Sequence, residues 1–335
     1  MYTRPLIPVH YICQIADYLE GIGHDSGKWL GHYKLTLEDV ISDQTLLDYE
    51  RFQGLIVAAI KLANQADIGL KVGQTLSINS HGALGFALLN CASLRQAIEL
   101  FQRYLPTRTP LLALTLNETP DYFKITLIEL FDITPIQQPF IETVVLTLKQ
   151  SLGFVRHQQN VFIRIELTST KPDYWQLCES LFGCEVLFSA AKNQLFIDLD
   201  SVDKSNGGVD QHTLKQAEAF CQIELDRLKN THQFAGQVRT LLMLSSNGSR
   251  NLEQIASKLH LTQRTLHRYL TREGSSFKQI LNDVLHTLAK QCFAKRLSVK
   301  QTAYEIGYAD VANFRRAFKR WQGQSPNDYR LQQKQ

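Results

Sequence analysis

The feature that most constrains the fold of this 335-residue chain is a pattern that occurs twice in its last hundred residues. In each copy a short apolar helix is followed by a tight turn and a second helix, whose apolar and basic residues lie on different faces. The copies span 251–273 and 299–322. This arrangement predicts two helix-turn-helix units.

In the first copy, NLEQIASKLHLTQRTLHRYLTRE, the expected turn is His260–Leu261. Thr262 is expected to cap the second helix, because its hydroxyl can accept a backbone N–H there. Leu266 and Leu270 are expected to face inward. The outward stripe repeats every four residues and consists of Arg264, Arg268 and Arg272, with His267 beside it.

In the second copy, Gly307 stands where a helix ending in a left-handed residue needs glycine. Asp310 is expected to cap the next helix. Phe314, Phe318 and Trp321 share one face and are predicted to be core. The basic residues Arg315, Arg316, Lys319 and Arg320 lie on the other faces.

A helix of about 20 residues, near 277–296, separates the copies and spans roughly 30 Å. One turn of B-DNA is about 34 Å, so two recognition helices held this far apart fit successive major grooves on one face of the duplex. Charge agrees with this prediction. Residues 232–335 hold 17 Lys and Arg against 6 Asp and Glu, a net of +11, whereas residues 1–231 carry a net of −7. Such asymmetry favours a polyanion-binding module joined to an acidic one, the alternative being a merely uneven distribution.

Residues 237–331 resemble the DNA-binding domain of the AraC/XylS transcription regulators. The match is densest over 303–330, AYEIGYADVANFRRAFKRWQGQSPNDYR, and TLHRYLTREGSSF at 265–277 resembles the first module. The family often has an arginine pair at the start of the linker helix, where this chain has Leu285 and His286. This departure bears on one phosphate contact and not on the fold.

The pattern and the resemblance favour a set of DNA-contacting residues: Thr262, Arg264, Thr265, His267, Arg268, Arg272, Asp310, Val311, Ala312, Asn313, Arg315, Arg316 and Lys319. Arginines of the first helix can bond guanine in a bidentate pair or touch phosphate alone. Val311 or Ala312 suits a thymine methyl. Arg316 can hold phosphate or brace its helix, and Lys319 can contact phosphate or remain solvated.

The first part of the chain mixes element types, which predicts an α+β domain before the all-α C-terminal domain. We expect an N-terminal domain at 1–205, a linker and connecting helix at 206–231, and a DNA-binding domain at 232–335. The helices are expected at 9–20, 43–64, 81–104 (two, with Ser93 capping the second), 138–157, 172–181 and 209–230. The strands are expected at 111–117, 122–130, 160–167, 184–188 and 194–199, with a linker at 203–210.

Residues 68–104 resemble the arabinose-binding type of sensor domain found in ornithine-utilisation and some virulence regulators, which implies a small-molecule effector. Apolar residues cluster in 101–131 and 140–154 and suit either a ligand pocket or an ordinary core. His81–Gly82 opens a helix, and capping is favoured there over ligand binding. GIGHDSGKW at 21–29 is not a phosphate loop, because Ile22 and Trp29 replace required residues, so a loop between helices is expected.

Six scattered cysteines without a CxxC pair favour a reducing cytoplasm, and the sequence shows neither a signal peptide nor a membrane-length apolar run. No catalytic or metal-binding spacing is present, so we expect neither enzyme activity nor a cofactor or metal. The prediction is a cytoplasmic bacterial transcription regulator, acting as an activator under effector control. Its expected partners are double-stranded promoter DNA, RNA polymerase, a small-molecule effector and a second copy of the chain. The alternatives are a ligand-independent regulator whose N-terminal half serves only association, and an enzyme fused to a DNA-binding module.

Overall fold

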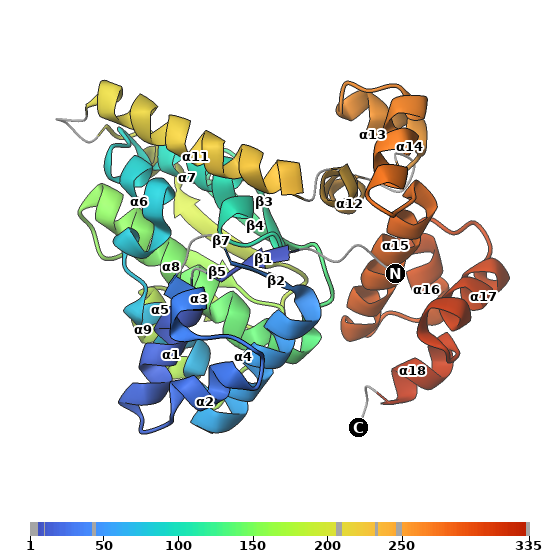
Figure 1. The fold of residues 1–335 in the computed structure, drawn as a ribbon, viewed down its shortest axis with the longest axis horizontal. Coiled ribbons are helices and arrows are strands. Elements are labelled where there is room, and N and C mark those ends of the chain that lie inside the picture. The colour runs from blue at the N-terminus through green and yellow to red at the C-terminus, as the bar shows by residue number, and fades with distance from the viewer. Residues whose placement is uncertain are drawn as a thin grey trace. The chain divides into compact units, whose positions relative to one another are not determined.

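The computed structural model describes residues 6–9, 11–41, 45–205, 210–231, 234–245 and 250–332 (Figure 1). Contacts divide these residues into two compact units. The N-terminal domain holds residues 6–129 and 133–228, and the C-terminal module holds residues 229–332 together with 130–132. The boundaries expected at 205 and 231 remain predictions.

A five-stranded sheet forms the β part of the N-terminal domain. Its strands are β3 (Leu112–Glu118), β4 (Tyr122–Glu129), β5 (Arg164–Glu166), β6 (Glu185–Leu187) and β7 (Asn193–Asp198). They lie in the order β3-β4-β7-β5-β6, and every neighbouring pair is antiparallel except β5 and β6. The hairpin predicted at 111–130 is confirmed, with Leu114 opposite Leu127. The strand predicted at 160–167 is shorter, because pairing with β6 and β7 covers only residues 164–166.

Helix α8 (Gln137–Arg156) packs against α5 (Ile68–Thr75), α6 (Gly82–Leu89) and α7 (Leu94–Tyr104). The approach of α5 to α8 depends on Gly69, where an added Cβ would lie 2.3 Å from the Pro139 carbonyl oxygen. The Thr143 hydroxyl donates to the Gly69 carbonyl at 2.8 Å across this contact. Ser93 caps α7 as predicted, accepting from the Gln96 amide at 3.3 Å.

The first 63 residues show two differences from the predicted elements. They form β1 (Leu6–Pro8), α1 (Ile12–Gly21), α2 (Ser26–Gly31), α3 (Leu37–Ile41), β2 (Leu46–Asp48) and α4 (Tyr49–Ala63). The helix predicted at 43–64 begins only at Tyr49, because β2 pairs with β1 and Asp48 then caps α4. The stretch at 21–29 is not simply a loop, since Asp25 caps α2 and Trp29 is buried, with its indole N–H donating to the Leu55 carbonyl at 3.1 Å.

The remaining elements of the domain are α9 (Trp175–Phe182), α10 (Leu199–Val202) and the 3-10 turns η1 (Ile78–His81), η2 (Leu105–Thr107) and η3 (Thr134–Ile136). Helix α11 (Gln211–Thr231) follows and lies alongside α7 (Figure 1). Its buried face repeats at helical spacing and consists of Leu214, Ala217, Cys221 and Leu225. The middle of the linker predicted at 203–210, residues 206–209, lies outside the described residues.

In the C-terminal module, the secondary-structure elements that the structure describes are helices. They are α12 (Phe234–Leu244), α13 (Leu252–Lys258), α14 (Gln263–Arg272), α15 (Phe277–Ala294), α16 (Val299–Glu305), α17 (Val311–Gln322) and α18 (Pro326–Gln332). Helix α15 contacts α12, α16 and α17. Around its Phe293, the rings of Phe314, Phe318 and Tyr329 pack with centroids 5.4–6.3 Å away. Aromatic pairs in this range stabilise a core beyond the area they bury.

In both predicted helix-turn-helix units, the second helix begins after the capping residue expected from the sequence. Thr262 Oγ1 accepts from the Thr265 amide at 3.1 Å, and Asp310 accepts from the amides of Ala312 and Asn313. The turns use left-handed backbone, with φ of +55° at His260 and +99° at Gly307. In the described part of the chain, no helix is long and apolar enough to cross a membrane.

Candidate nucleic-acid interface and effector cavity

Helix α14 presents a basic face to solvent. Arg264, His267, Arg268 and Arg272 are all exposed, as the repeat of the sequence predicts. Leu266 and Leu270 are buried on the opposite side. Between the two faces, Tyr269 stacks on Phe234 of α12 with ring centroids 4.2 Å apart, and the Arg268 guanidinium lies 5.5 Å from the Tyr269 centroid. The helix is therefore anchored on one side while its cations reach outward.

Helix α17 is divided in the same way, with a larger apolar anchor. Phe314 and Phe318 are fully buried, whereas Trp321, also predicted as core, is half-buried. The outward residues are Ala312, Asn313, Arg315, Arg316, Lys319 and Arg320. Val311 is half-buried against the aromatic core, so Ala312 is the more accessible of the two aliphatic candidates.

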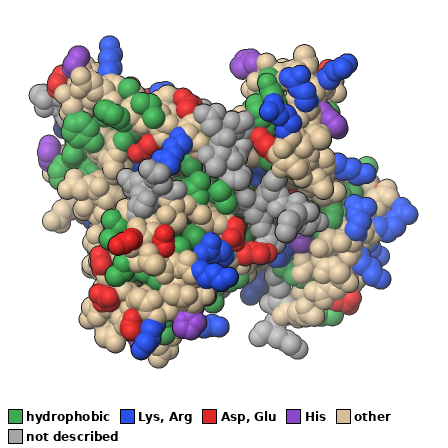
Figure 2. Space-filling view, viewed as in Figure 1, with side chains coloured by type: hydrophobic (Ala, Val, Ile, Leu, Met, Phe, Trp, Pro, Cys, Tyr) green, Lys and Arg blue, Asp and Glu red, His purple; other side chains and the backbone are tan. Residues whose placement is uncertain are grey.

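The basic residues of α17 open onto one shallow hollow. Arg315, Arg316 and Lys319 line it together with Ser325, Pro326 and Asn327 at the start of α18. Arg316 Nη2 donates to Asn313 Oδ1 at 2.6 Å, which ties this guanidinium to the first turn of its own helix. Figure 2 shows Lys and Arg side chains gathered over α14 and α17.

His286, which stands where the resemblance leads one to expect arginine, takes part in the core of the module. Its ring meets Phe318 edge-on at 5.6 Å, and its Nε2 lies 2.8 Å from Gln322 Oε1. Burial lowers the pKa of His286, which favours the neutral ring. The residue therefore joins α15 to α17 in place of a solvent-facing cation.

Arg250, which the sequence pattern did not single out, directly precedes the first helix-turn-helix unit and bonds to α12 and to the second unit. Its Nε donates to the Leu242 carbonyl at 3.0 Å, and its Nη1 donates to the Ile306 carbonyl at 3.3 Å. Leu242 belongs to α12, and Ile306 ends α16. One side chain thus satisfies carbonyls at two helix ends that would otherwise lack intrahelical partners.

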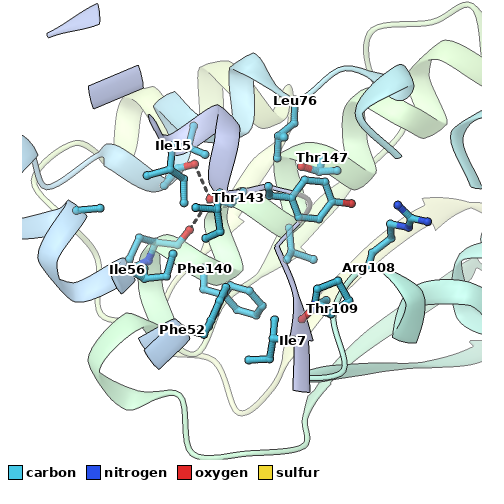
Figure 3. A pocket seen from close by; sticks show the side chains of 18 of the residues that line it. Ile7, Ile15, Phe52, Ile56, Leu76, Arg108, Thr109, Phe140, Thr143 and Thr147 are labelled. Carbon is cyan, nitrogen blue, oxygen red and sulfur yellow. Dashed lines mark hydrogen bonds between the residues drawn. The ribbon is translucent and has the colours of Figure 1, made fainter. Parts of the chain in front are cut away.

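The N-terminal domain contains a cavity of about 120 Å³ with an almost wholly apolar lining (Figure 3). The two stretches singled out in the sequence contribute residues such as Phe101 and Phe140. The sequence did not indicate the contributions of β1, α1, α4 and α5. In α4 the available signal was helical spacing, because the lining residues Phe52, Ile56, Ala59 and Ile60 recur on one face.

One set of polar groups in the cavity wall surrounds Arg108, and Thr143 and Thr147 of α8 add two hydroxyls elsewhere in the lining. In Figure 3, Arg108 and Thr109 lie at one end, and Ile15 and Ile56 lie at the other. Arg108 is 4% exposed and forms an ion pair with Glu224 of α11. Its Nε also donates to Thr107 Oγ1 at 3.1 Å. A buried guanidinium thus has a carboxylate partner from the last helix of the domain.

His81 belongs to this polar end, and it stands at the N-cap position of α6 as expected, although its side chain does not form the cap. It makes no side-chain capping bond to α6 and is buried in the cavity wall. Tyr11 Oη lies 2.7 Å from His81 Nδ1, while His81 Nε2 has no hydrogen-bond partner among the described residues. Burial, with the nearby charge of Arg108, lowers the pKa of His81 to about 4, so the ring is neutral at pH 7.

Comparisons with known proteins agree with both halves of this description. A model of the arabinose-binding domain of AraC transcription regulators matches residues 23–206, and a helix-turn-helix domain model matches residues 255–332. The ornithine utilization regulator of Pseudomonas aeruginosa is 26% identical over 330 residues, covering 98% of this chain and 97% of that protein.

Two further similarities are more limited in identity or extent. The urease operon transcriptional activator of Escherichia coli is 37% identical over 86 residues, 25% of this chain and 29% of that one. The crystal structure of the regulator CdpR from Pseudomonas aeruginosa is 20% identical, with a TM-score of 0.44 over 91% of this chain and 97% of that chain. In the residues that the structure describes, no group of three or more His, Cys, Asp or Glu is placed to hold a metal ion.

Proposed function

This chain belongs to the AraC transcription regulators with an arabinose-binding-type N-terminal domain, and we propose that it activates transcription from promoter DNA under the control of a small molecule. It is a regulator with a helix-turn-helix DNA-binding domain. Activation is supported by the similarity of its C-terminal part to a named activator. In this proposal RNA polymerase is the second macromolecular partner.

The observation that carries the DNA-binding proposal is the pair of exposed basic helices, α14 and α17, on one compact module. On α14, Arg264, His267 and Arg268 are the base-reading candidates, and Arg272 contacts phosphate. The fork of an arginine matches the O6 and N7 acceptors of guanine. Thr262 acts through the helix start that it caps, and Thr265 bonds to it, with the two hydroxyl oxygens 2.9 Å apart.

On α17 the proposed roles divide along the helix. The exposed methyl of Ala312 suits a thymine methyl, and Asn313 lies beside it on the first turn. The hollow bordered by Arg315, Arg316 and Lys319 suits a phosphate. Asp310 fixes the helix start, since both of its carboxylate oxygens already accept backbone N–H groups.

The base-reading assignment is tested by Arg268→Ala. A duplex selected from random sequence by the wild-type protein is compared with a scrambled duplex, using fluorescence anisotropy. Loss of a bidentate guanine contact should weaken operator binding by about 10- to 100-fold while scarcely changing scrambled binding. Lys295→Ala, which removes an exposed cation after α15, is the control. Equal loss on both duplexes for Arg268→Ala would reduce Arg268 to a phosphate contact.

Footprinting tests the use of both units. One monomer holding successive major grooves should protect two adjacent turns of the duplex, whereas protection of half a turn would contradict the two-unit proposal.

The effector role is supported by the cavity of the N-terminal domain, which is apolar with a few polar groups in its wall. A compound that binds there should raise the melting temperature of the full-length protein and change its affinity for the selected operator. Stabilisation without any change in operator affinity would contradict effector control.

A second candidate role for the N-terminal domain is self-association without a ligand. Helix α11 supports it, because Phe220 and Ile223 lie on one turn and are 63% and 64% exposed. Sedimentation of Phe220→Ser and Ile223→Ser proteins tests this role. Dimerisation that is lost in these variants, with no stabilisation by any small molecule, would favour the second candidate over effector control.

A further inference from the structure

We propose that the N-terminal cavity binds a small apolar monocarboxylate. Its carboxylate pairs with Arg108 in place of Glu224, so that α11 loses one of its ion pairs with the rest of the domain. This inference rests on the proposed effector role of the domain and adds the chemical class of the ligand and the contact through which its binding is transmitted.

The cavity sets the size and polarity of the ligand. A volume of about 120 Å³ is close to that of apolar protein cavities that accept benzene, so a ring or a short chain fills it. At the end opposite Arg108, where Figure 3 labels Ile15 and Ile56, the Thr143 hydroxyl is already bonded to the carbonyls of Gly69 and Pro139. A ligand with several polar groups would leave them without partners at that end.

Arg108 defines where the head of the ligand lies. It is the one Lys or Arg among the described lining residues. Within the described chain its hydrogen bonds run from Nε to Thr107 and from Nη2 to Glu224, so Nη1 has no protein acceptor there. Gly82 is the neighbour on this side of the guanidinium, and its missing side chain keeps Nη1 uncrowded, because an added Cβ would be in ordinary contact with Nη1 at 3.5 Å. Arg108 therefore lines the cavity and keeps N–H donors on Nη1 from which a ligand carboxylate can accept.

His81 supplies a second donor at the same end. Burial raises the pKa of the Tyr11 hydroxyl far above its usual range, so this hydroxyl stays protonated and can donate to His81 Nδ1. When the Tyr11 hydroxyl donates, the hydrogen of the neutral imidazole lies on Nε2, the atom that has no partner in the described residues. An unpaired buried donor is unfavourable, and a ligand oxygen would satisfy it.

The charge balance favours one negative charge on the ligand. With His81 neutral, Arg108 contributes a single positive charge to the cavity, and a monocarboxylate replaces Glu224 without changing the net charge. A phosphate dianion would bring a surplus negative charge into an apolar space, where isolated charges are strongly disfavoured.

Of the two residues in the ion pair, Glu224 is the one that can move away from the other. Its side chain is 39% exposed and can turn to water, whereas Arg108 is 4% exposed and cannot. Glu224 lies two-thirds of the way along α11, and α12 of the DNA-binding module is the next helix in the chain. The buried face formed by Leu214, Ala217, Cys221 and Leu225 is separate from this pair, so exchange at Arg108 removes one polar contact of α11 and leaves its apolar packing in place.

The test is calorimetric titration of the full-length protein with two matched pairs of probes, benzoate with benzyl alcohol and hexanoate with 1-hexanol. Each pair shares its apolar part and differs in the charged head. We expect each acid to bind at least tenfold more tightly than its alcohol. Alcohols that bind as tightly as the acids, or acids that do not bind, would overturn the proposal.

Two variants and two controls locate the head group. Arg108→Gln should abolish the preference for acids while alcohol affinity stays within threefold, which also reports an intact cavity. Glu224→Gln should raise the affinity for acids about tenfold because the competing carboxylate is gone. Arg103 and Glu218 form a second pair between α7 and α11, 3.9 Å apart and outside the cavity lining, so Arg103→Gln and Glu218→Gln should change neither value. If the affinity for acids is unchanged in Glu224→Gln, the proposed competition between Glu224 and the ligand for Arg108 is wrong.

Operator affinity measured with and without each probe separates this proposal from the effector role. The acids should shift wild-type operator affinity, and Glu224→Gln should show the shifted affinity without ligand. If alcohols shift operator affinity as strongly as acids, the effector role stands and the carboxylate assignment falls. If both classes bind and neither shifts operator affinity, the proposed effector control itself fails.

Discussion

The two compact units of this protein place several of their ionisable side chains in opposite environments. In the N-terminal domain Arg108, His81 and Glu142 are buried, and two of them bear atoms without a hydrogen-bond partner among the described residues. On α14 and α17 the basic side chains are exposed to solvent. A buried charge can distinguish one small ligand from another through desolvation, whereas exposed charges attract a polyanion over a distance. The same residue type therefore suits recognition of a small molecule in one unit and of DNA in the other.

Arg239 is an exception to this difference, because it is a buried arginine within the DNA-binding module. Its Nη2 lies 2.9 Å from Asp283 Oδ2, which joins α12 to α15. Asp283→Ala should lower the free energy of unfolding of the module by about 3–5 kcal/mol, because a buried charge loses its counter-ion. Urea denaturation measures this loss. Glu253→Ala, at an exposed position of α13, is the control and should change stability by less than about 0.5 kcal/mol.

Because Glu142 is buried, we expect the stability of the N-terminal domain to depend on pH. Burial raises its pKa to about 7 from the usual 4.5, although Gln138 and Tyr174 bond to one of its oxygens. The folded state therefore binds the proton more tightly than the unfolded state. Its contribution to stability is full below pH 4.5 and disappears as pH rises to 7.

The matched variant is Glu142→Gln, which cannot titrate. Relative to this variant, the wild-type N-terminal domain should lose about 2 kcal/mol of stability between about pH 5.5 and pH 8. Chemical denaturation at each pH measures the difference. Taking the difference cancels the contribution of His81, whose lowered pKa acts in the opposite direction. Glu185→Gln, an exposed carboxyl on β6, is the control, and a constant difference for Glu142→Gln would contradict burial as the cause.

The smallest expected effect concerns an exposed cation. Lys319→Ala should weaken binding to operator and scrambled duplexes equally, because a phosphate contact carries no sequence information. The slope of log affinity against log salt should fall in magnitude by about one. Anisotropy titrations over a series of salt concentrations measure it. A selective loss on the operator would instead assign Lys319 to base recognition.

The C-terminal module could be predicted closely because its signals are local. The caps Thr262 and Asp310 act within three residues, and the aromatic face of α17 repeats within two turns. A sequence pattern displays such relations directly. The hairpin of β3 and β4 was predictable for the same reason, since its turn and alternating strands are contiguous.

The candidate effector site could not be predicted in the same way, because its pairs are distant in sequence. Tyr11 meets His81 across 70 positions, and Arg108 meets Glu224 across 116. The strand β2 was misread as the start of a helix, since LLD is too short for a period and depends on pairing with β1. The apolar stretches indicated a pocket or a core, and only the folded chain shows which of their residues leave a space between them.

The bridge that Arg250 forms between α12 and the end of α16 has a consequence for the DNA sequence itself. The bridge and the shared α15 join both helix-turn-helix units within one compact module. Each base pair inserted between the half-sites rotates the second groove by about 34–36° and moves it about 3.4 Å along the axis, given about 10–10.5 base pairs per turn. Under the proposed use of both units, such an insertion turns the second half-site away from α17 unless the module deforms. The proposal therefore predicts that the helical phase between half-sites, as well as their base sequence, determines operator affinity.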